Sequence, residues 1–252
     1  MIDKNCEVIT VEEIQKKIYI LQVKSRNIAN AAKPGQFCNI KVSDSYSPLL
    51  RRPFSICDVK NDVITFQFAL VGEGTEILSK KRQGDLLDIN GPLGNGFDYS
   101  GDFKNAVIVA GGIGTAPFPF LTGQLKDKNI ITLVGSKTKT DVIKYKLKNV
   151  SVATDDGSEG FNGNVVKLLE SVAGKYKKDE TKIFACGPNP MLRALSKYTI
   201  ANGYNCEIST ESNMACGFGI CQGCNIHSAV DENKFLLVCK DGPVFNAEDV
   251  LL

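Results

Sequence analysis

Four cysteines near the end of the sequence have a spacing that can bind metal. Cys216, Cys221 and Cys224 follow one another as C-x4-C-x2-C, and Cys239 comes further along the chain. Thiolates are soft ligands that suit iron–sulfur clusters, and this spacing is typical of plant-type [2Fe–2S] sites. The main alternative is a structural zinc site, whose ligands more often come as two CxxC pairs. We therefore interpret these cysteines as the ligands of one [2Fe–2S] cluster, a carrier of single electrons.

The other cysteines and the histidine do not suggest a second metal site. The chain has 9 cysteines and 1 histidine, so a site that needs two histidine ligands is excluded. Disulfides are disfavoured in the cytosol, and a dense local group of cysteines there indicates metal. We interpret His227 as a surface residue, because four thiolates complete the site without it. The sequence assigns no role to Cys6, Cys38, Cys57 and Cys206.

Two glycine-containing turns have the form of phosphate-binding turns. The first, Gly111 to Pro117, reads GGIGTAP and follows an apolar run. Glycines at such a turn allow a pyrophosphate to approach the N-terminus of the next helix. The second, Cys186-Gly187-Pro188, also lies between an expected strand and an expected helix. Both would lie at carboxyl ends of strands, where open α/β sheets bind ligands, although each could also be a plain strand–helix turn.

A short segment in the first half combines a guanidinium group, an aromatic ring and a hydroxyl around a proline. It reads Arg51-Arg52-Pro53-Phe54-Ser55. An arginine can hold a phosphate, an aromatic ring can stack on a ring system, and a hydroxyl can reach a polar ring atom. Taken alone, the segment is more simply a strand with an exposed arginine.

The elements that must position these residues change in type near residue 101. Residues 1–100 contain short, partly alternating apolar runs separated by turn residues, which favours a small antiparallel barrel of six strands. We expect its strands at 7–10, 18–23, 36–42, 52–57, 63–70 and 85–89, and a short helix at 75–81.

Residues 101–210 alternate apolar runs with helical stretches. Continuous apolar runs suit strands that are buried on both faces of a parallel sheet, which predicts a doubly wound nucleotide-binding domain. Strands are expected at 106–110, 130–134, 150–153 and 182–185, and helices at 116–126, 164–176 and 190–202. Residues 211–252 form a third, Cys- and Gly-rich domain with one expected strand at 234–238. It is too small for a good core of its own, so something else must order it.

The overall composition excludes several classes of protein. The 252 residues are 43% hydrophobic and 23% charged, with a formal net charge of +2. No basic patch interleaved with aromatic residues indicates nucleic-acid binding. No run of about 20 apolar residues predicts a membrane span, and the N-terminus lacks the apolar stretch of a signal peptide. We therefore expect a cytoplasmic protein.

Taken in order along the chain, these motifs resemble the ferredoxin-reductase superfamily. Within it, the sequence closely resembles the electron-transfer subunits of class 1B dihydroorotate dehydrogenases over essentially its whole length. The matching segments are Arg52 to Ser55, Gly72 to Thr75, Gly91 to Phe97, Gly111 to Pro117, Thr154 to Ser158, Cys186 to Pro188, the four C-terminal cysteines, and Asp241 to Phe245.

The resemblance implies a flavin-binding barrel, an NAD-binding domain and a [2Fe–2S] domain. It also implies a partner, an FMN-containing catalytic subunit that oxidises dihydroorotate, in a heterotetramer of two of each subunit. Electrons would pass from that FMN through the cluster and FAD to NAD+, in pyrimidine (UMP) biosynthesis, with no acid or base required from this chain. The implied FAD contacts are Arg52, Pro53, Phe54, Ser55, Gln67, Phe68, Ala69, Gly74 and Thr75. The implied NAD contacts are Gly111, Gly112, Gly114, Thr115, Cys186, Gly187 and Pro188.

Two other functions remain open from the sequence. One is a related NAD(P)H reductase subunit of an electron-bifurcating ferredoxin–NADP reductase or a sulfide dehydrogenase. The other is a redox sensor that does not turn over. The choice of nicotinamide is also open, since Lys137 and Lys139 follow the second expected α/β strand, where an acidic residue often binds the NAD ribose. They could attract the 2′-phosphate of NADP or simply face solvent, and we predict a modest preference for NADH.

Overall fold

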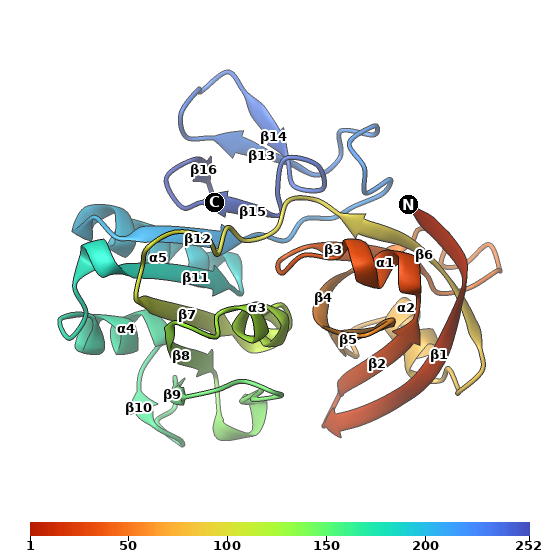
Figure 1. Cartoon of the computed structure of the whole chain (residues 1–252), viewed down its shortest axis with the longest axis horizontal. Helices are drawn as coiled ribbons and strands as arrows, with labels where there is room; N and C mark the ends of the chain where they lie inside the picture. The colour runs from red at the N-terminus through yellow and green to blue at the C-terminus, as the bar shows by residue number, and fades with distance from the viewer.

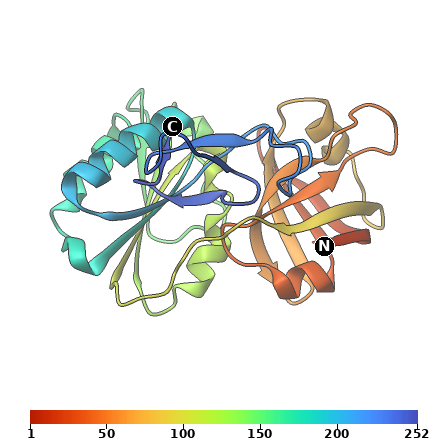
Figure 2. The ribbon, with the colours of Figure 1, turned by 90° about the horizontal axis from the view of Figure 1, so that it is seen from above.

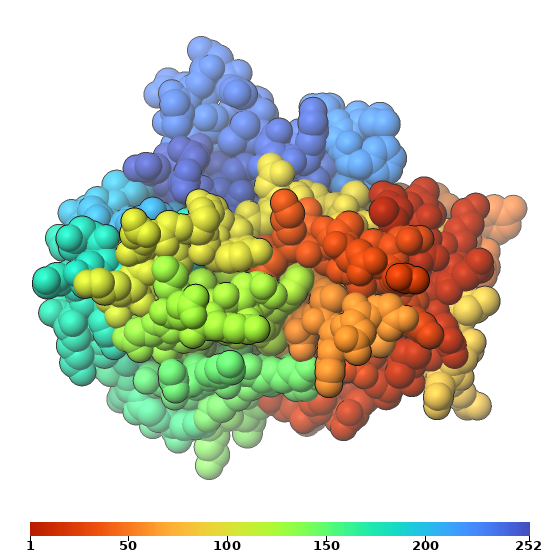
Figure 3. Space-filling view, in the orientation of Figure 1, coloured from red at the N-terminus to blue at the C-terminus, as the bar shows by residue number.

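Three β-sheets organise residues 1–252, all of which the computed structural model describes (Figure 1). The N-terminal sheet closes into a barrel, the second is a seven-stranded sheet, and the third is a small C-terminal sheet of three strands. The barrel and the seven-stranded sheet lie side by side, and the C-terminal segment stands on top of them (Figures 1 and 3). No helix is long and apolar enough to cross a membrane.

The barrel confirms the six-stranded antiparallel prediction. Its strands follow the order β1-β2-β5-β4-β3-β6, and every neighbouring pair is antiparallel. Alternate residues of a strand face opposite sides, so Ile64, Phe66 and Phe68 fill the interior with other apolar side chains. The strands are β1 (Ile2–Gln15), β2 (Ile18–Lys24), β3 (Phe37–Lys41), β4 (Arg52–Lys60), β5 (Val63–Ala69) and β6 (Leu86–Leu93).

Two short helices accompany the barrel. Helix α2 (Glu73–Ser79) begins two residues before the expected 75–81. Helix α1 (Arg26–Ala31) was not expected from the sequence. The Ser25 side chain caps α1 by accepting a hydrogen bond from the Ile28 N–H, as N-cap serines commonly do.

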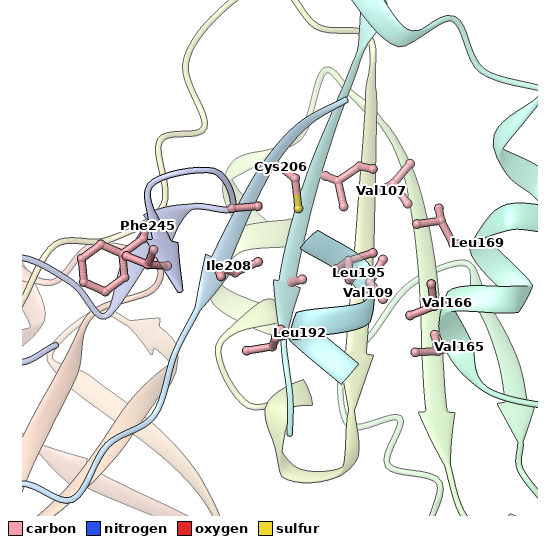
Figure 4. Close-up of a cluster of buried hydrophobic side chains, with 14 of the residues drawn as sticks. Val107, Val109, Val165, Val166, Leu169, Leu192, Leu195, Cys206, Ile208 and Phe245 are labelled. Atoms are coloured by element: carbon pink, nitrogen blue, oxygen red, sulfur yellow. The ribbon is translucent and has the colours of Figure 1, made fainter. Parts of the chain in front are cut away.

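The seven-stranded sheet confirms a doubly wound layout. Helix α3 (Phe118–Gln124) covers the face that carries Ala106, Ile108 and Ala110, and α4 (Val165–Ala173) and α5 (Asn189–Asn202) cover the face that carries Val107 and Val109 (Figure 4). The strand order is β10-β9-β8-β7-β11-β12-β15. The bounds are β7 (Asn105–Gly111), β8 (Asn129–Ser136), β9 (Val150–Thr154), β10 (Phe161–Asn162), β11 (Thr181–Cys186), β12 (Asn205–Ser209) and β15 (Val244–Asn246).

The sheet is wider than the four strands expected from the sequence. Strand β12 extends it beyond β11, and the short β10 closes the other side. Strand β15 comes from the C-terminal segment and pairs antiparallel with β12, with Ile208 opposite Phe245. The α/β region and the C-terminal segment are therefore joined by a sheet ladder.

The C-terminal segment contains more strands than the single one expected at 234–238. Besides β15, it has β13 (Asn225–Ser228), β14 (Phe235–Leu237) and β16 (Val250–Leu251), which pair in the order β14-β13-β16. Its buried residues Leu237, Val238, Phe245 and Val250 belong to the same apolar cluster as the α/β strands and helices. The segment is thus ordered in part by the core of its neighbour.

Candidate functional site

A cavity of about 380 Å³ lies between the barrel and the carboxyl ends of the α/β strands, and we call it the interdomain cavity. The barrel contributes Arg52 to Ser55 from β4 and Gln67 to Ala69 from β5, with Thr75 from α2. The α/β sheet contributes Ile113, Ala116 and Cys186. The expected FAD contacts therefore share one continuous space with Cys186, one of the expected NAD contacts. Hydride exchange between a flavin and a nicotinamide requires such a shared space.

Arg52 supplies a positive charge that no carboxylate of the chain neutralises. Its guanidinium Nη1 donates to the Leu50 carbonyl at 2.6 Å, and the ion pairs of the chain do not include it. Gly74 lies directly against it, since a Cβ at that position would come within 3.1 Å of Arg52 Nε. Arg51 differs, because it forms an ion pair with Asp88 at 2.7 Å. Arg52 is therefore the arginine available to an anionic ligand such as a phosphate.

A buried amide connects the two walls of the interdomain cavity. Gln67 Nε2 donates to Thr115 Oγ1 at 2.9 Å, which joins β5 to the first glycine turn. Gln67 is 2% exposed, and its Oε1 has no hydrogen-bond partner within the chain. Since buried polar atoms are nearly always paired, this oxygen fits a site that a polar ligand group completes.

The two glycine turns lie against each other behind the interdomain cavity. A Cβ at Gly114 would overlap the Cys186 carbonyl, and a Cβ at Gly111 would come within 3.0 Å of Pro188. Gly112 has a φ of +55° with open space where a Cβ would be, so a ligand can approach its backbone. Of the expected NAD contacts, Cys186 lines the cavity. The others lie behind its wall, and they are Gly111, Gly112, Gly114, Thr115, Gly187 and Pro188.

The four C-terminal cysteines are arranged as two pairs. The Cys221 N–H donates to Cys216 Sγ at 3.4 Å, and the Cys239 N–H donates to Cys224 Sγ at 3.4 Å. No point in the chain gathers three or more Cys, His, Asp or Glu side chains around a single ion. Four cysteines supply the all-thiolate donor set that a [2Fe–2S] cluster takes, two thiolates to each iron.

The two pairs differ in exposure and in acidity. Cys224 and Cys239 are each 2% exposed, whereas Cys221 is exposed and Cys216 is half-buried. Burial and then the neighbouring Cys224 thiol raise the pKa of Cys239 to about 12. Burial also opposes ionisation of Cys216, but N–H groups of the loop, led by that of Cys221, outweigh it and lower its pKa to about 6. The loop is therefore already arranged to stabilise a thiolate at Cys216.

Residues 211–224, which we call the cysteine loop, contain no helix or strand. Gly217 and Gly219 have φ values of +77° and +89°, which side chains other than glycine rarely adopt. Gly223 does not have a positive φ, and its neighbour Gln222 adopts +61°. The loop lies over the barrel wall near β3 and β6 (Figures 1 and 2).

Several residues of the site were not found from the sequence. Thr210, just before the cysteine loop, and Glu211 and Met214, at its start, line the interdomain cavity. Phe37 lines it from β3. Asp155 and Asp156 lie beside the turn that follows β8 and carries Lys137, since their N–H groups donate to the carbonyls of Ser136 and Lys137. Their separation in sequence hid this proximity, and only the parallel pairing of β8 with β9 indicates it.

Comparisons with known proteins agree with this arrangement. Residues 211–251 match the iron-sulfur cluster binding domain of dihydroorotate dehydrogenase B. The dihydroorotate dehydrogenase B (NAD(+)) electron transfer subunit of Bacillus mycoides is 38% identical, over 99% of this chain and 98% of that protein. The subunit of the same name from Bacillus pumilus is 38% identical over 97% of this chain and 96% of its own length.

Solved structures show the same fold. An NADH-dependent reduced ferredoxin–NADP oxidoreductase, studied for flavin-based electron bifurcation, matches with a TM-score of 0.86 at 27% identity, over 98% of this chain and 90% of that one. A ferredoxin NADP+ reductase from Neisseria gonorrhoeae, solved with FAD and NADP bound, matches with a TM-score of 0.68 at 16% identity, over 85% of this chain and 95% of that one. The second likeness concerns the fold alone.

Proposed function

This chain belongs to the family of dihydroorotate dehydrogenase B electron transfer subunits, and we propose that it passes electrons from a partner dihydroorotate dehydrogenase subunit to NAD+ through a [2Fe–2S] cluster and FAD. It is accordingly an oxidoreductase component that serves pyrimidine biosynthesis. The observation that carries the proposal is the position of the paired cysteines over the barrel wall, next to a cavity shared by the barrel and the α/β sheet.

The cofactors supply the redox chemistry, since a nicotinamide exchanges two electrons as hydride, a [2Fe–2S] cluster carries one, and a flavin can do both. The chain's own residues bind and orient. Arg52 offers its unpaired charge to a flavin phosphate, Phe54 offers its ring, and the backbone of Gln67 to Ala69 lines the ring-binding space. The glycine turns bring a nicotinamide nucleotide to the same cavity.

Electrons would enter at the part of the cysteine loop between Cys216 and Cys221. Phe218 is 50% exposed and Ile220 is 75% exposed, between the first two cysteines. Exposed apolar side chains of this kind suit contact with another protein. We propose that the FMN-containing catalytic subunit docks here, and that two copies of each subunit form the working heterotetramer in the cytoplasm.

We also propose three domains, which are residues 1–100 for FAD binding, 101–210 for NAD binding and 211–252 for the cluster. The assigned FAD contacts are Arg52, Pro53, Phe54, Ser55, Gln67, Phe68, Ala69, Gly74 and Thr75. The assigned cluster ligands are Cys216, Cys221, Cys224 and Cys239.

Two measurements test the proposal. Anaerobic addition of NADH to the purified protein should bleach its flavin absorbance, which a redox sensor without turnover would not show at a catalytic rate. Mixing with the FMN-containing subunit should then give NAD+ reduction that depends on dihydroorotate, and native mass spectrometry should give two copies of each chain. A protein that bleaches with NADH, ignores dihydroorotate and prefers NADPH would instead be a bifurcating reductase subunit, the class of its structural neighbour.

A further inference from the structure

Asn39 is a buried amide that has no hydrogen-bond partner. It lies on β3, is 1% exposed, and neither its side-chain nitrogen nor its side-chain oxygen has a partner within the chain. Leaving a carboxamide unpaired in a protein interior destabilises the fold, because its hydrogen bonds to water are lost without replacement. Such a residue therefore needs a physical reason, and a ligand that completes its hydrogen bonds is one.

The side chain of Asn39 faces the cysteine loop. Its neighbours on β3, Cys38 and Ile40, belong to the apolar interior of the barrel, so Asn39 lies on the outer face of the same strand. A Cβ on Gly217 would overlap Asn39 Nδ2 and would come within 3.5 Å of Leu93 Cδ1. Asn39 therefore lies against Gly217, the residue that follows Cys216.

We propose that Asn39 donates a side-chain N–H to a sulfur of the [2Fe–2S] cluster on its Cys216 side and so raises the reduction potential of the cluster. This inference rests on the proposed function, because it requires the cluster to be present. A donor directed at sulfur stabilises the more negative, reduced state, and hydrogen bonds to the sulfurs are among the main determinants of cluster potential. In a buried setting such a bond is stronger than in water.

Asn39 would differ from the other sulfur donors of the site. The Cys221 and Cys239 N–H groups belong to the backbone of the C-terminal segment, and no side-chain substitution removes them. Asn39 belongs to the barrel, on the strand next to Pro53 of the interdomain cavity. Asn39 would therefore contact the cluster directly, from a barrel strand that neighbours the flavin wall, and glycine at 217 leaves the room that its amide needs.

The decisive experiment measures the midpoint potential of the cluster in the purified holoprotein by an EPR-monitored redox titration. Asn39→Leu keeps the side-chain volume but removes the donor, and we expect its cluster potential to move to a more negative value while the flavin potential stays unchanged. After exchange into D2O, the wild type should show a deuteron coupled to the reduced cluster that Asn39→Leu lacks. Thr132→Val is the control, because it removes a buried polar group on β8, a hydroxyl, that likewise has no hydrogen-bond partner, and it should change neither reading.

Asn39→Asp provides a second variant should Asn39→Leu not fold, because it keeps the shape and replaces the donor with an acceptor. It should lower the potential further. Unchanged cluster potentials in the Asn39 variants would overturn the inference, and so would a shift confined to the flavin. A wild type without a [2Fe–2S] EPR signal would overturn the proposed function itself, which separates the two failures.

Discussion

The interdomain cavity and the cysteine loop are built in opposite ways. Most of the cavity wall comes from strands β3, β4 and β5, from Ile113 and Ala116 after β7, and from the end of β11, whose positions are fixed by backbone ladders and by apolar cores on both sides. The first residues of the cysteine loop complete it. The cysteine loop has no helix or strand and depends on residues with positive φ at 217, 219 and 222. The flavin site is therefore shaped by the fold of the barrel and the sheet, whereas the cluster site depends on its own ligands for its shape.

Loss of a single cluster ligand should have the largest effect and should affect only one of these regions. We expect Cys216→Ser, Cys221→Ser, Cys224→Ser and Cys239→Ser each to lose most iron and sulfide, because a hydroxyl is a poor substitute for a thiolate. FAD content should stay near one per chain, and proteolysis should cut within residues 211–224. Cys57→Ser, in a buried cysteine of the barrel, is the control and should keep its cluster. Full iron and sulfide in all four ligand variants would disprove the assignment.

The next largest effect is expected from removing the aromatic side chain that packs the C-terminal segment onto the α/β core. Phe245 on β15 is 8% exposed and packs within the α/β core, so Phe245→Ala should lower the free energy of unfolding by about 3–5 kcal/mol. Phe235 on β14 is 52% exposed, and Phe235→Ala should cost less than about 0.5 kcal/mol. Denaturant unfolding of both variants measures the difference. Equal, small losses would mean that the C-terminal segment does not depend on the neighbouring core.

The neighbouring arginines Arg51 and Arg52 allow a sharper test of the cavity alone. Arg52→Ala should weaken FAD binding by about 1.5–3 kcal/mol, because a charge-assisted bond to a phosphate is lost. Arg51→Ala should leave FAD binding nearly unchanged, since Arg51 is paired with Asp88. Flavin dissociation constants from fluorescence give the comparison. Similar losses in the two variants would remove the reason for assigning the phosphate to Arg52.

The smallest effect is expected at the turn after β8, which carries Lys137. Lys137 is exposed and lies beside Asp155 and Asp156. Lys137→Glu replaces its positive charge with a negative one, so it should disfavour the 2′-phosphate of NADPH a few-fold more than the wild type does. The measurement is the ratio of kcat/KM for NADH and NADPH. Lys126→Glu makes the same change in charge before the amino end of β8 and should not alter the ratio. A wild type that prefers NADPH would contradict the expected preference for NADH.

The sequence predicted the parts of this architecture that depend on local patterns. Alternation marked the barrel strands, and the continuous apolar runs at 106–110 and 182–185 marked strands that are buried on both faces. The spacing of the first three cysteines depends on only a short stretch of chain, and the assignment of all four as cluster ligands stays a prediction. The structure adds the pairing of Cys216 with Cys221 and of Cys224 with Cys239. Arg52 to Ser55 and Gln67 to Ala69 were expected to share a site, and they line one cavity.

What the sequence could not predict depends on contacts between distant segments. Strand β12 is only five residues long and begins with Asn205 and Cys206, which carry little β signal, so its place is set by pairing with β11. Glu211 and Met214 reach the cavity because β12 directs the chain there. Asn39 reads as an ordinary polar residue of a strand, and only the cysteine loop that folds over it makes it unusual.

Strand β15 has a further consequence for the behaviour of the chain in a crowded solution. Without it, β12 would present an unpaired row of N–H and C=O groups along five residues, and exposed edges of that kind promote association between chains. Strand β15 pairs with Glu207 to Ser209 of that row, and with 3 residues it is itself too short to template another strand. The C-terminal segment therefore also protects this sheet edge from association with other chains. A chain truncated before residue 244 is expected to self-associate even if its barrel folds normally.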